Sequence, residues 1–217
     1  MNREWMSISD MMSGLMLVFL FIAISFMVKI ESQKQKMQDV ALEYRDIKVN
    51  LNEALYGEFE EDLKRWNASI TKDNRVVFSS PEVLFDISSS DIKDEFKLVL
   101  EDFFARYVKV LTSKEYKDEI YELRVEGHTS KSWKGANSAD EIYLNNMKLS
   151  QDRAYSVLKY CHSLKDEAIQ KNKNWLEKHL RANGMAFSEI KSEDESRRVE
   201  FRIEMKSEER VTQLLDL

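Results

Sequence analysis

An uninterrupted apolar stretch near the N-terminus is the strongest pattern in the chain. Residues 11–28 contain no charged side chain and are bracketed by Asp10 and Lys29. A helix of this length, at about 1.5 Å per residue, covers most of the hydrocarbon thickness of a bilayer, and Trp5 would mark one interface. A cleaved signal peptide is the alternative, but the stretch is longer than a signal h-region and no small-x-small cleavage site follows Val28. We therefore predict a retained membrane-spanning helix.

A heptad-like spacing of apolar residues follows this stretch. Between Glu31 and Trp66 there is no proline, and Gly57 is the only glycine, which favours one long helix. Apolar side chains recur at alternating intervals of three and four positions: Met37, Val40, Tyr44, Ile47, Leu51 and Ala54. This spacing is typical of the a/d seam of a coiled coil, and it predicts a parallel homodimer. The open alternative is one amphipathic helix that lies on the domain after it.

The rest of the chain alternates between strand-like and helix-like patterns. Short apolar or alternating runs predict strands at 75–78, 82–87, 120–126, 181–187 and 198–205. Helical spacing of apolar residues predicts helices at about 91–111, 141–163 and 166–180. We therefore predict an α+β domain with a β-α-β-α-β core. The chain then divides into an N-terminus with a transmembrane helix (1–30), a helical, coiled-coil-like stalk (31–70) and a folded domain (71–217).

Composition excludes several classes of function. The 217 residues carry 33 basic and 39 acidic side chains, a net charge of −6, so the chain has no general attraction for nucleic acid. A single cysteine, Cys161, excludes an internal disulfide framework and a Cys-rich metal site. No Walker-type loop is present, and no nucleophile-elbow pattern surrounds Ser130. His128 has no partners at metal-ligand spacing, so we interpret it as a loop residue that packs or forms hydrogen bonds. The chain is predicted not to be an enzyme and to need no cofactor.

Asp10 lies at the edge of the apolar stretch and allows two interpretations. It could cap the start of the helix together with Ser7 and Ser9, by accepting hydrogen bonds from free N–H groups. A carboxylate close to hydrocarbon is also costly, and such residues commonly mark ion pathways. The residues alone leave both interpretations open.

Several segments of the predicted domain occur in a recognisable order. They are Val83-Leu84-Phe85-Asp86, Val125-Glu126-Gly127-His128-Thr129, Asn146-x-x-Leu149-Ser150-x-x-Arg153-Ala154 and Ser196-Arg197-Arg198-Val199-Glu200. Together they resemble the OmpA-like peptidoglycan-binding domain that is also found in MotB proteins. The resemblance implies that Arg153 clamps the carboxylate of a diaminopimelate-type peptide and that Thr129, Asn146 and Leu149 line the same pocket. Ser130 occupies the position where the family usually has an aspartate for the ligand's ammonium group, and a hydroxyl supplies no charge there.

The N-terminal segment extends this resemblance. Trp5-x-x-x-Ser9-Asp10-Met11-Met12-Ser13-Gly14-Leu15-Met16 resembles the start of the span in MotB-type stator subunits, in which the aspartate carries the ion. Together with segments 187–190 and 196–201, it looks like the MotB-related subunit of Zorya anti-phage defence systems. The resemblance implies a single-pass bacterial inner-membrane protein with a cytoplasmic N-terminus and a periplasmic wall-binding domain. Counting basic residues weakly favours the opposite orientation, with Arg3 before the span and Lys29, Lys34 and Lys36 after it.

The sequence therefore predicts a peptidoglycan-anchored stator subunit of an ion-driven inner-membrane motor of the Zorya type. Asp10 would carry H⁺ or Na⁺, and the wall-binding residues would be Thr129, Ser130, Asn146, Leu149 and Arg153. The implied partners are a MotA-like membrane ring, a second copy of the chain, and peptidoglycan. Two alternatives stay open: a flagellar MotB-type stator subunit, and a passive membrane-to-wall tether in which Asp10 is only a helix cap.

Overall fold

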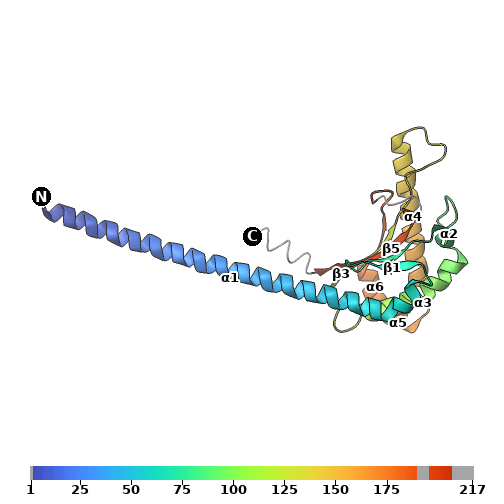
Figure 1. Cartoon of the computed structure of the whole chain (residues 1–217), viewed down its shortest axis with the longest axis horizontal. Coiled ribbons are helices and arrows are strands. Elements are labelled where there is room, and N and C mark those ends of the chain that lie inside the picture. The colour runs from blue at the N-terminus through green and yellow to red at the C-terminus, as the bar shows by residue number, and fades with distance from the viewer. Residues whose placement is uncertain (1, 190–195, 207–217) are drawn as a thin grey trace.

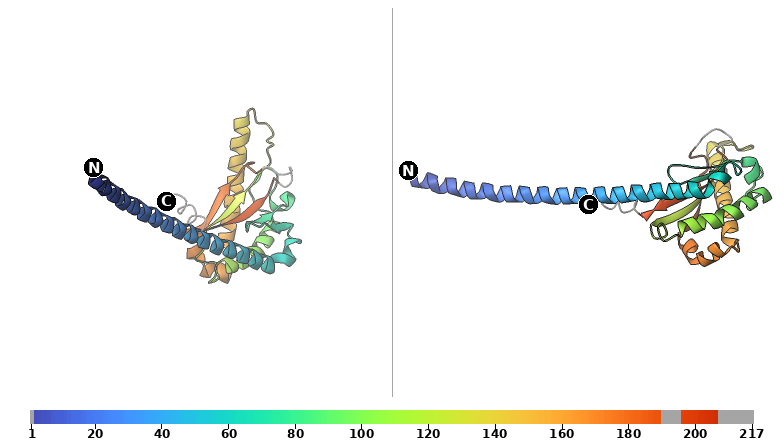
Figure 2. Two further views of the ribbon diagram at one scale, coloured as in Figure 1. Left: turned by 60° about the vertical axis from the view of Figure 1, so that its left-hand side comes forward. Right: turned by 60° about the horizontal axis from the view of Figure 1, so that its bottom comes forward.

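A single long helix joins the N-terminal region to the folded domain. The computed structural model describes residues 2–189 and 196–206. Helix α1 (Asn2–Leu63) contains 62 residues and extends away from a domain that holds the other described elements (Figure 1). The views in Figure 2 show the same arrangement, with the N-terminal part of α1 standing clear of the domain. The predicted membrane helix and the predicted stalk are therefore one continuous helix. Within the described ranges, it is the one helix long and apolar enough to cross a membrane.

The last turns of α1 belong to the core of the domain. Leu51, Leu55 and Phe59 are fully buried, and their spacing of four places them on one helix face. Four neighbours on α1 pack against the same core: Tyr44, Ile47, Ala54 and Leu63. The core therefore begins near residue 44 rather than at the predicted boundary of 71. The second half of the predicted dimer seam contacts this chain's own domain, as the alternative of an amphipathic helix describes.

Polar contacts fix this part of α1 to its neighbours. Arg106 on helix α3 (Asp94–Leu111) forms ion pairs of 2.6 Å with both Glu58 and Asp62 of α1. On another side, Asn52 donates a hydrogen bond of 2.7 Å to the side chain of Asn74. Asn74 takes a left-handed backbone conformation (φ 60°) in a tight turn. These contacts attach the end of α1 to the domain.

Five strands form one mixed sheet. They are β1 (Ala68–Ile70), β2 (Val76–Phe78), β3 (Ile120–Gly127), β4 (Leu180–Gly184) and β5 (Val199–Met205), in the order β1-β2-β5-β3-β4. The pair β3 and β4 is parallel, and the other neighbours are antiparallel. The predicted α+β class is confirmed. Strand β1 was not predicted, and it extends the sheet beyond the predicted β-α-β-α-β core.

Two of the predicted elements differ from the structure. The strand predicted at 82–87 is wrong: helix α2 (Pro81–Leu84) occupies its first part, and Phe85 forms only an isolated bridge with Ile92. The helix predicted at 166–180 is divided into α5 (Glu167–Lys171) and α6 (Lys173–His179). The long helix α4 (Ala139–Ser163) agrees with its prediction to within two residues at its start.

The core lies between the sheet and the helices α1, α3 and α4. Successive side chains of β3 and β5 point to opposite faces of the sheet. Apolar residues such as Val125 and Phe201 are buried on one face, and charged residues occupy the other. Phe103 of α3 lies at the centre, with ring centroids 5.2 Å from Phe59 and 5.0 Å from Phe201. The same aromatic cluster therefore joins α1, α3 and the sheet.

Two glycines let α4 approach the sheet closely. A Cβ atom on Gly127 would lie 2.3 Å from the Ser150 carbonyl oxygen, and one on Gly184 would lie 2.7 Å from the Gln151 nitrogen. Only glycine fits at such distances without backbone movement. As a result, α4 lies directly against the ends of β3 and β4, beside the loop that follows β3. This packing positions the pocket described next.

Candidate wall-binding pocket

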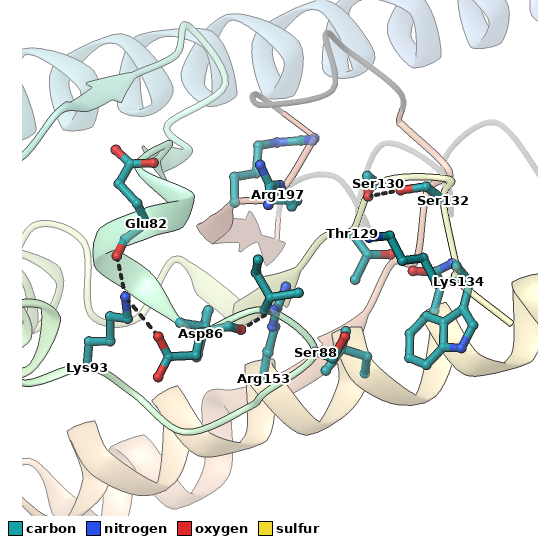
Figure 3. A pocket seen from close by; sticks show the side chains of 16 residues that line it. Glu82, Asp86, Ser88, Lys93, Thr129, Ser130, Ser132, Lys134, Arg153 and Arg197 are labelled. Carbon is teal, nitrogen blue, oxygen red and sulfur yellow. Dashed lines mark hydrogen bonds and ion pairs between the residues drawn. The ribbon is translucent and has the colours of Figure 1, made fainter.

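The five residues predicted to bind the cell wall line one cavity. Its volume is about 540 Å³, and Thr129, Ser130, Asn146, Leu149 and Arg153 all contribute to its wall. The cavity lies between the loop after β3, the first half of α4, the segment after α2 and the residues just before β5 (Figure 3). Segments far apart in the sequence therefore meet as the family resemblance implies.

Arg153 is a buried cation at this site. Its side chain is 7% exposed, and it donates hydrogen bonds to the backbone carbonyls of Ser89 (2.8 Å, from Nε) and Asp86 (3.2 Å, from Nη2). The guanidinium also lies 4.8 Å from the centre of the Phe85 ring. Burial, and then the positive charge of Arg197, lower the pKa of Arg153 to about 10, so the group stays charged at neutral pH. No carboxylate within the described ranges pairs with it, and the site therefore favours an anion.

The loop after β3 supplies hydroxyl groups to the cavity. Thr129 is buried, and its Oγ1 has no hydrogen-bond partner among the described residues. The backbone N–H of Thr129 donates to the Ala186 carbonyl at 2.8 Å, which fixes the loop. Ser130 Oγ lies 3.2 Å from Ser132 Oγ. A buried hydroxyl without a partner is costly in a closed protein, and at a pocket wall it is suited to a ligand.

Helix α4 forms the side of the cavity opposite the loop after β3. Asn146 is buried, and its side-chain Nδ2 donates to the Ile142 carbonyl one turn earlier, at 3.0 Å. Leu149 is half-buried and adds an apolar surface. The carbonyl of the Asn146 side chain, the apolar Leu149 and the cation of Arg153 thus follow one another along the helix at intervals of three and four residues.

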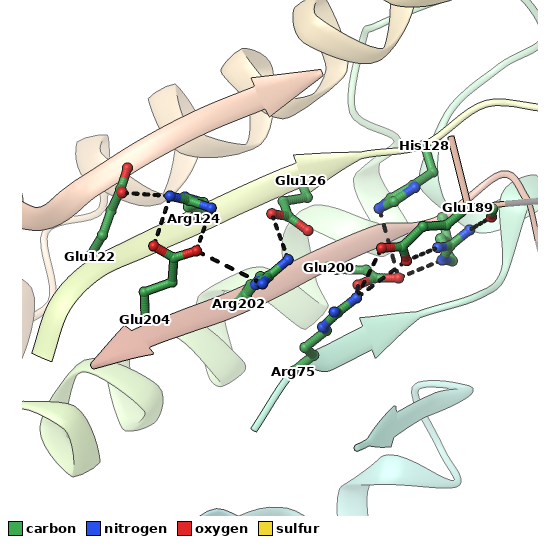
Figure 4. Close-up of polar contacts among 10 residues, drawn as sticks. Arg75, Glu122, Arg124, Glu126, His128, Glu189, Glu200, Arg202 and Glu204 are labelled. Carbon is green, nitrogen blue, oxygen red and sulfur yellow. Dashed lines mark hydrogen bonds and ion pairs between the residues drawn. The ribbon is translucent and has the colours of Figure 1, made fainter. Parts of the chain in front are cut away.

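A network of charged side chains joins Arg75, Glu189 and Glu200, which are labelled in Figure 4. Arg198, which lines the cavity, donates from Nε to Glu200 at 2.5 Å. Arg75 lies 3.2 Å from Glu189 and 3.4 Å from Glu200. These partners come from two distant parts of the chain, residue 75 and the segment 189–200, and the sequence analysis did not predict that they pair. The network fixes the segment before β5, which forms one wall of the pocket.

His128 lies within this network. It is 1% exposed, and its Nε2 lies 3.7 Å from Glu200 Oε1. Burial, and then the charge of Arg198, lower the pKa of His128 to about 4, so its ring is neutral at pH 7. Its location agrees with the prediction of a packed residue beside a loop.

Three side chains of the network offer ligand atoms within 4.8 Å of one another: Glu126, His128 and Glu200. A divalent cation would have to compete there with the guanidinium groups of Arg198 and Arg202, which lie 2.5 Å from Glu200 and 3.9 Å from Glu126. Because the arginines already balance the carboxylates, the arrangement suits a structural ion-pair network better than a metal centre.

Asp10 lies at the other end of the molecule. Its backbone is within α1, whose first residue is Asn2. The helix therefore begins well before Asp10, and the interpretation of Asp10 as the cap of the helix is wrong. The N-terminal end of α1 is far from the domain that carries the pocket (Figure 1).

Comparison with known proteins identifies the family. No protein-family model matches the chain. A search of curated proteins finds "Zorya protein ZorB" of Escherichia coli, which is 39% identical over 222 residues and aligns with 99% of this chain and 93% of its own length. The chain belongs to the ZorB family. The resemblance to the MotB-related Zorya subunit is thus confirmed for the whole chain.

A search of solved structures finds chains that are similar to part of this one. The cell wall anchor of the T6SS from Pseudomonas aeruginosa is 20% identical with a TM-score of 0.46, and the match covers 70% of this chain and 96% of that one. A MotB-like protein from Desulfovibrio vulgaris is 17% identical (TM-score 0.45, 80% and 98% covered). The periplasmic domain of Helicobacter pylori MotB is 16% identical (TM-score 0.44, 69% and 96% covered).

Further pocket residues were not assigned from the sequence. They include Lys93, Trp133, Lys134, Arg197 and Arg198. Arg197 and Arg198 belong to a motif that the resemblance used, but the motif did not say which side chains face a cavity. The others lie in irregular segments, where no periodicity marks a common face.

Proposed function

We propose that this ZorB-family chain is the peptidoglycan-anchored stator subunit of an ion-driven inner-membrane motor in an anti-phage defence system. The observation that carries the proposal is the full-length identity of 39% with ZorB, which includes both the apolar helix and the domain with the pocket. In this proposal Asp10 carries H⁺ or Na⁺, and the pocket around Arg153 binds the cell wall.

The exposed surface of α1 supports a membrane location. Large apolar side chains along its N-terminal part are uncovered, for example Leu15 at 56% and Phe19 at 62% exposure. Exposed apolar surface on this scale is unfavourable in water and requires lipid or a protein partner. We place this part of α1 across the inner membrane, with the N-terminus in the cytoplasm and the domain in the periplasm. Two copies would pass through a ring of a MotA-like partner.

The pocket supports anchoring to peptidoglycan. Arg153 is held by two backbone carbonyls, so its guanidinium is oriented before a ligand arrives. Such a fork pairs with a carboxylate through two parallel hydrogen bonds, and the carboxylates of wall peptides are suitable ligands. Thr129 Oγ1, on the adjacent side of the pocket, offers a further hydrogen bond to such a ligand.

The proposed mechanism combines an ion site near the N-terminus of α1 with a wall-bound domain at the C-terminal end of the same helix. An ion that reaches Asp10 neutralises its carboxylate and changes how the helix fits the surrounding ring. Each unit charge that crosses the membrane releases about 2.3 kcal/mol per 100 mV. The wall holds the domain still, and the packing of Leu51, Leu55 and Phe59 into the core transmits that restraint to α1. The ring therefore turns around a fixed helix.

Replacement of Asp10 by Asn tests the proposal. In cells that carry the complete defence locus, Asp10→Asn should abolish protection in a phage plaque assay while the membrane level of the protein is unchanged. Asp39→Asn, at an exposed position of the same helix, is the matched control and should protect normally. A passive tether predicts full protection by both variants, and a flagellar stator predicts a loss of swimming instead. Full protection by Asp10→Asn would refute ion carriage by this residue.

A further inference from the structure

The turn between β1 and β2 is fastened to helix α1 by two side-chain amides. Asn74 is 2% exposed, and its Nδ2 donates a hydrogen bond to the Lys48 carbonyl of α1 at 3.0 Å. From α1, Asn52 Nδ2 donates to Asn74 Oδ1 at 2.7 Å and to the Thr71 carbonyl at 2.9 Å. These hydrogen bonds bridge the helix and the turn in both directions, so the position of the turn follows the position of α1.

Arg75 connects this turn to the charged residues that precede and begin β5. Its Nη1 lies 3.2 Å from Glu189 and 3.4 Å from Glu200 (Figure 4). Arg198 contacts the same two acids, because its Nε donates to Glu200 at 2.5 Å and its Nη2 lies 3.4 Å from Glu189. The two arginines therefore share both carboxylates, and Arg198 lines the pocket.

The shared carboxylates fix the orientation of Arg198. Glu200 is 2% exposed, and its two oxygens face different partners, Oε1 toward Arg198 and Oε2 toward Arg75. The last torsion of a glutamate side chain is broad, so the loss of one arginine frees the carboxylate to turn toward the other. Arg75 is not among the described residues that line the cavity, yet its loss would change the geometry of a side chain that does.

The backbone carries the same link to a second side of the pocket. The carbonyl of Arg198 accepts a hydrogen bond of 3.0 Å from the N–H of His128, which directly precedes Thr129 of the pocket loop. A shift of the segment before β5 is therefore transmitted to the loop after β3. Contacts of hydrogen-bond or ion-pair length thus run from α1 through the turn and Arg75 to two sides of the cavity.

We propose that Arg75 is a positioning residue that couples helix α1 to the pocket, so that the affinity of the pocket for the cell wall depends on the contact between α1 and the turn at 71–75. The coupling is reciprocal, and wall binding tightens the same contact. This inference rests on the proposed wall-binding function and adds a link from the binding site to α1.

Sedimentation of the full-length chain in detergent with purified sacculi tests the coupling with matched arginine variants. Arg75 and Arg124 have side-chain exposures of 20% and 25%, and each pairs with two carboxylates. Arg75→Gln should weaken binding about 10-fold, and Arg75→Lys, which keeps the charge, should recover part of the loss. Arg124→Gln should bind as wild type, because its partners Glu122 and Glu204 are not among the described residues of the cavity wall.

Hydrogen exchange in the unaltered chain gives a second readout, which does not depend on the folding of a variant. Fragments of sacculi digested with a muramidase are added to the protein, and exchange is followed by mass spectrometry. The amides at 71–75, where Asn74 N–H donates to the Thr71 carbonyl at 3.0 Å, should exchange at least about 3-fold more slowly with fragments present. Those at 112–118, outside the network, should not change.

The outcomes separate the coupling from the wall-binding function. Equal binding by Arg75→Gln and wild type, equal losses in Arg75→Gln and Arg124→Gln, or unchanged exchange at 71–75 in protein that binds the fragments would each overturn the inference while wall binding stands. If wild-type protein does not sediment with sacculi, the wall-binding function fails and the inference fails with it.

Discussion

The two ends of α1 present similar apolar side chains in opposite surroundings. Phe19 and Leu20 are 62% and 54% exposed, while Leu55 and Phe59 are fully buried. One uninterrupted helix contains all four, so helix formation does not explain the difference. The domain itself covers the C-terminal end, whereas the N-terminal end needs cover from outside the chain. Burial of a large apolar side chain contributes about 1.5–3 kcal/mol, and this requirement at the N-terminal end is the physical basis for a membrane location.

The largest expected effect comes from removing the buried end of α1. A fragment of residues 71–217 lacks Leu51, Leu55, Phe59 and Trp66, all of which are in the core. Their combined loss exceeds a typical domain stability of about 5–15 kcal/mol, so this fragment should not unfold cooperatively. A fragment of residues 40–217 should show a sharp thermal transition by circular dichroism. Equal transitions in the two fragments would contradict the assignment of this part of α1 to the core.

A matched pair of phenylalanines gives the next largest effect. Phe59→Ala should lower the free energy of unfolding of the domain by about 3–5 kcal/mol, because it leaves a cavity beside Phe103. Phe19→Ala in the exposed stretch should change it by less than about 0.5 kcal/mol. Denaturant titration of the full chain in detergent, followed by tryptophan fluorescence, measures both values. Similar losses for the two variants would mean that the ends of α1 are not energetically distinct.

A smaller expected effect is a dependence of stability on pH, which should affect the domain and not the exposed N-terminal end of α1. The pKa of His128 is lowered to about 4 in the folded domain, against an ordinary value of 6.5. As the pH falls below 6.5 the unfolded chain binds the proton first, so stability is lost until the pH passes the folded value near 4. The domain should be about 2 kcal/mol less stable at pH 5 than at pH 7 from this group alone.

The variant His128→Gln should reduce that pH dependence by the same amount. The helicity of the exposed end of α1 should not change over this range, as measured by circular dichroism in detergent. An unaltered slope of stability against pH in His128→Gln would show that this histidine does not titrate as its burial requires.

Elements with a strong period were predictable from the sequence. The alternation in β5 and the apolar runs of α3 and α4 each specify one buried face. The prediction of a strand at 82–87 was wrong because a short apolar run such as Val83-Leu84-Phe85 fits a strand or a buried helical turn equally well. The apolar seam through Ile47 and Leu51 correctly predicted a helix, but it did not identify the surface that covers it. Helical spacing is the same whether a second copy of the chain or the chain's own domain covers the apolar face.

The pocket was predictable only in part, and for a similar reason. Motif order placed Thr129, Asn146 and Arg153 together, and the structure confirms that they line one cavity. Arg197 and Lys93 are in irregular segments, so their approach to the same cavity depends on tertiary packing. The pairing of Arg75 with Glu189 and Glu200 joins residues more than 100 positions apart, and no local pattern encodes it.

Binding of the full chain to purified cell-wall sacculi is the most direct test of wall anchoring. Detergent-solubilised protein would be sedimented with sacculi as wild type, Arg153→Lys and Lys159→Ala. The account predicts that wild type and Lys159→Ala sediment together with the wall. Arg153→Lys keeps the charge but loses the guanidinium fork, and it should bind at least about 10-fold more weakly. Wild-type protein that stays in the supernatant, or an Arg153→Lys variant that binds as well as wild type, would contradict it.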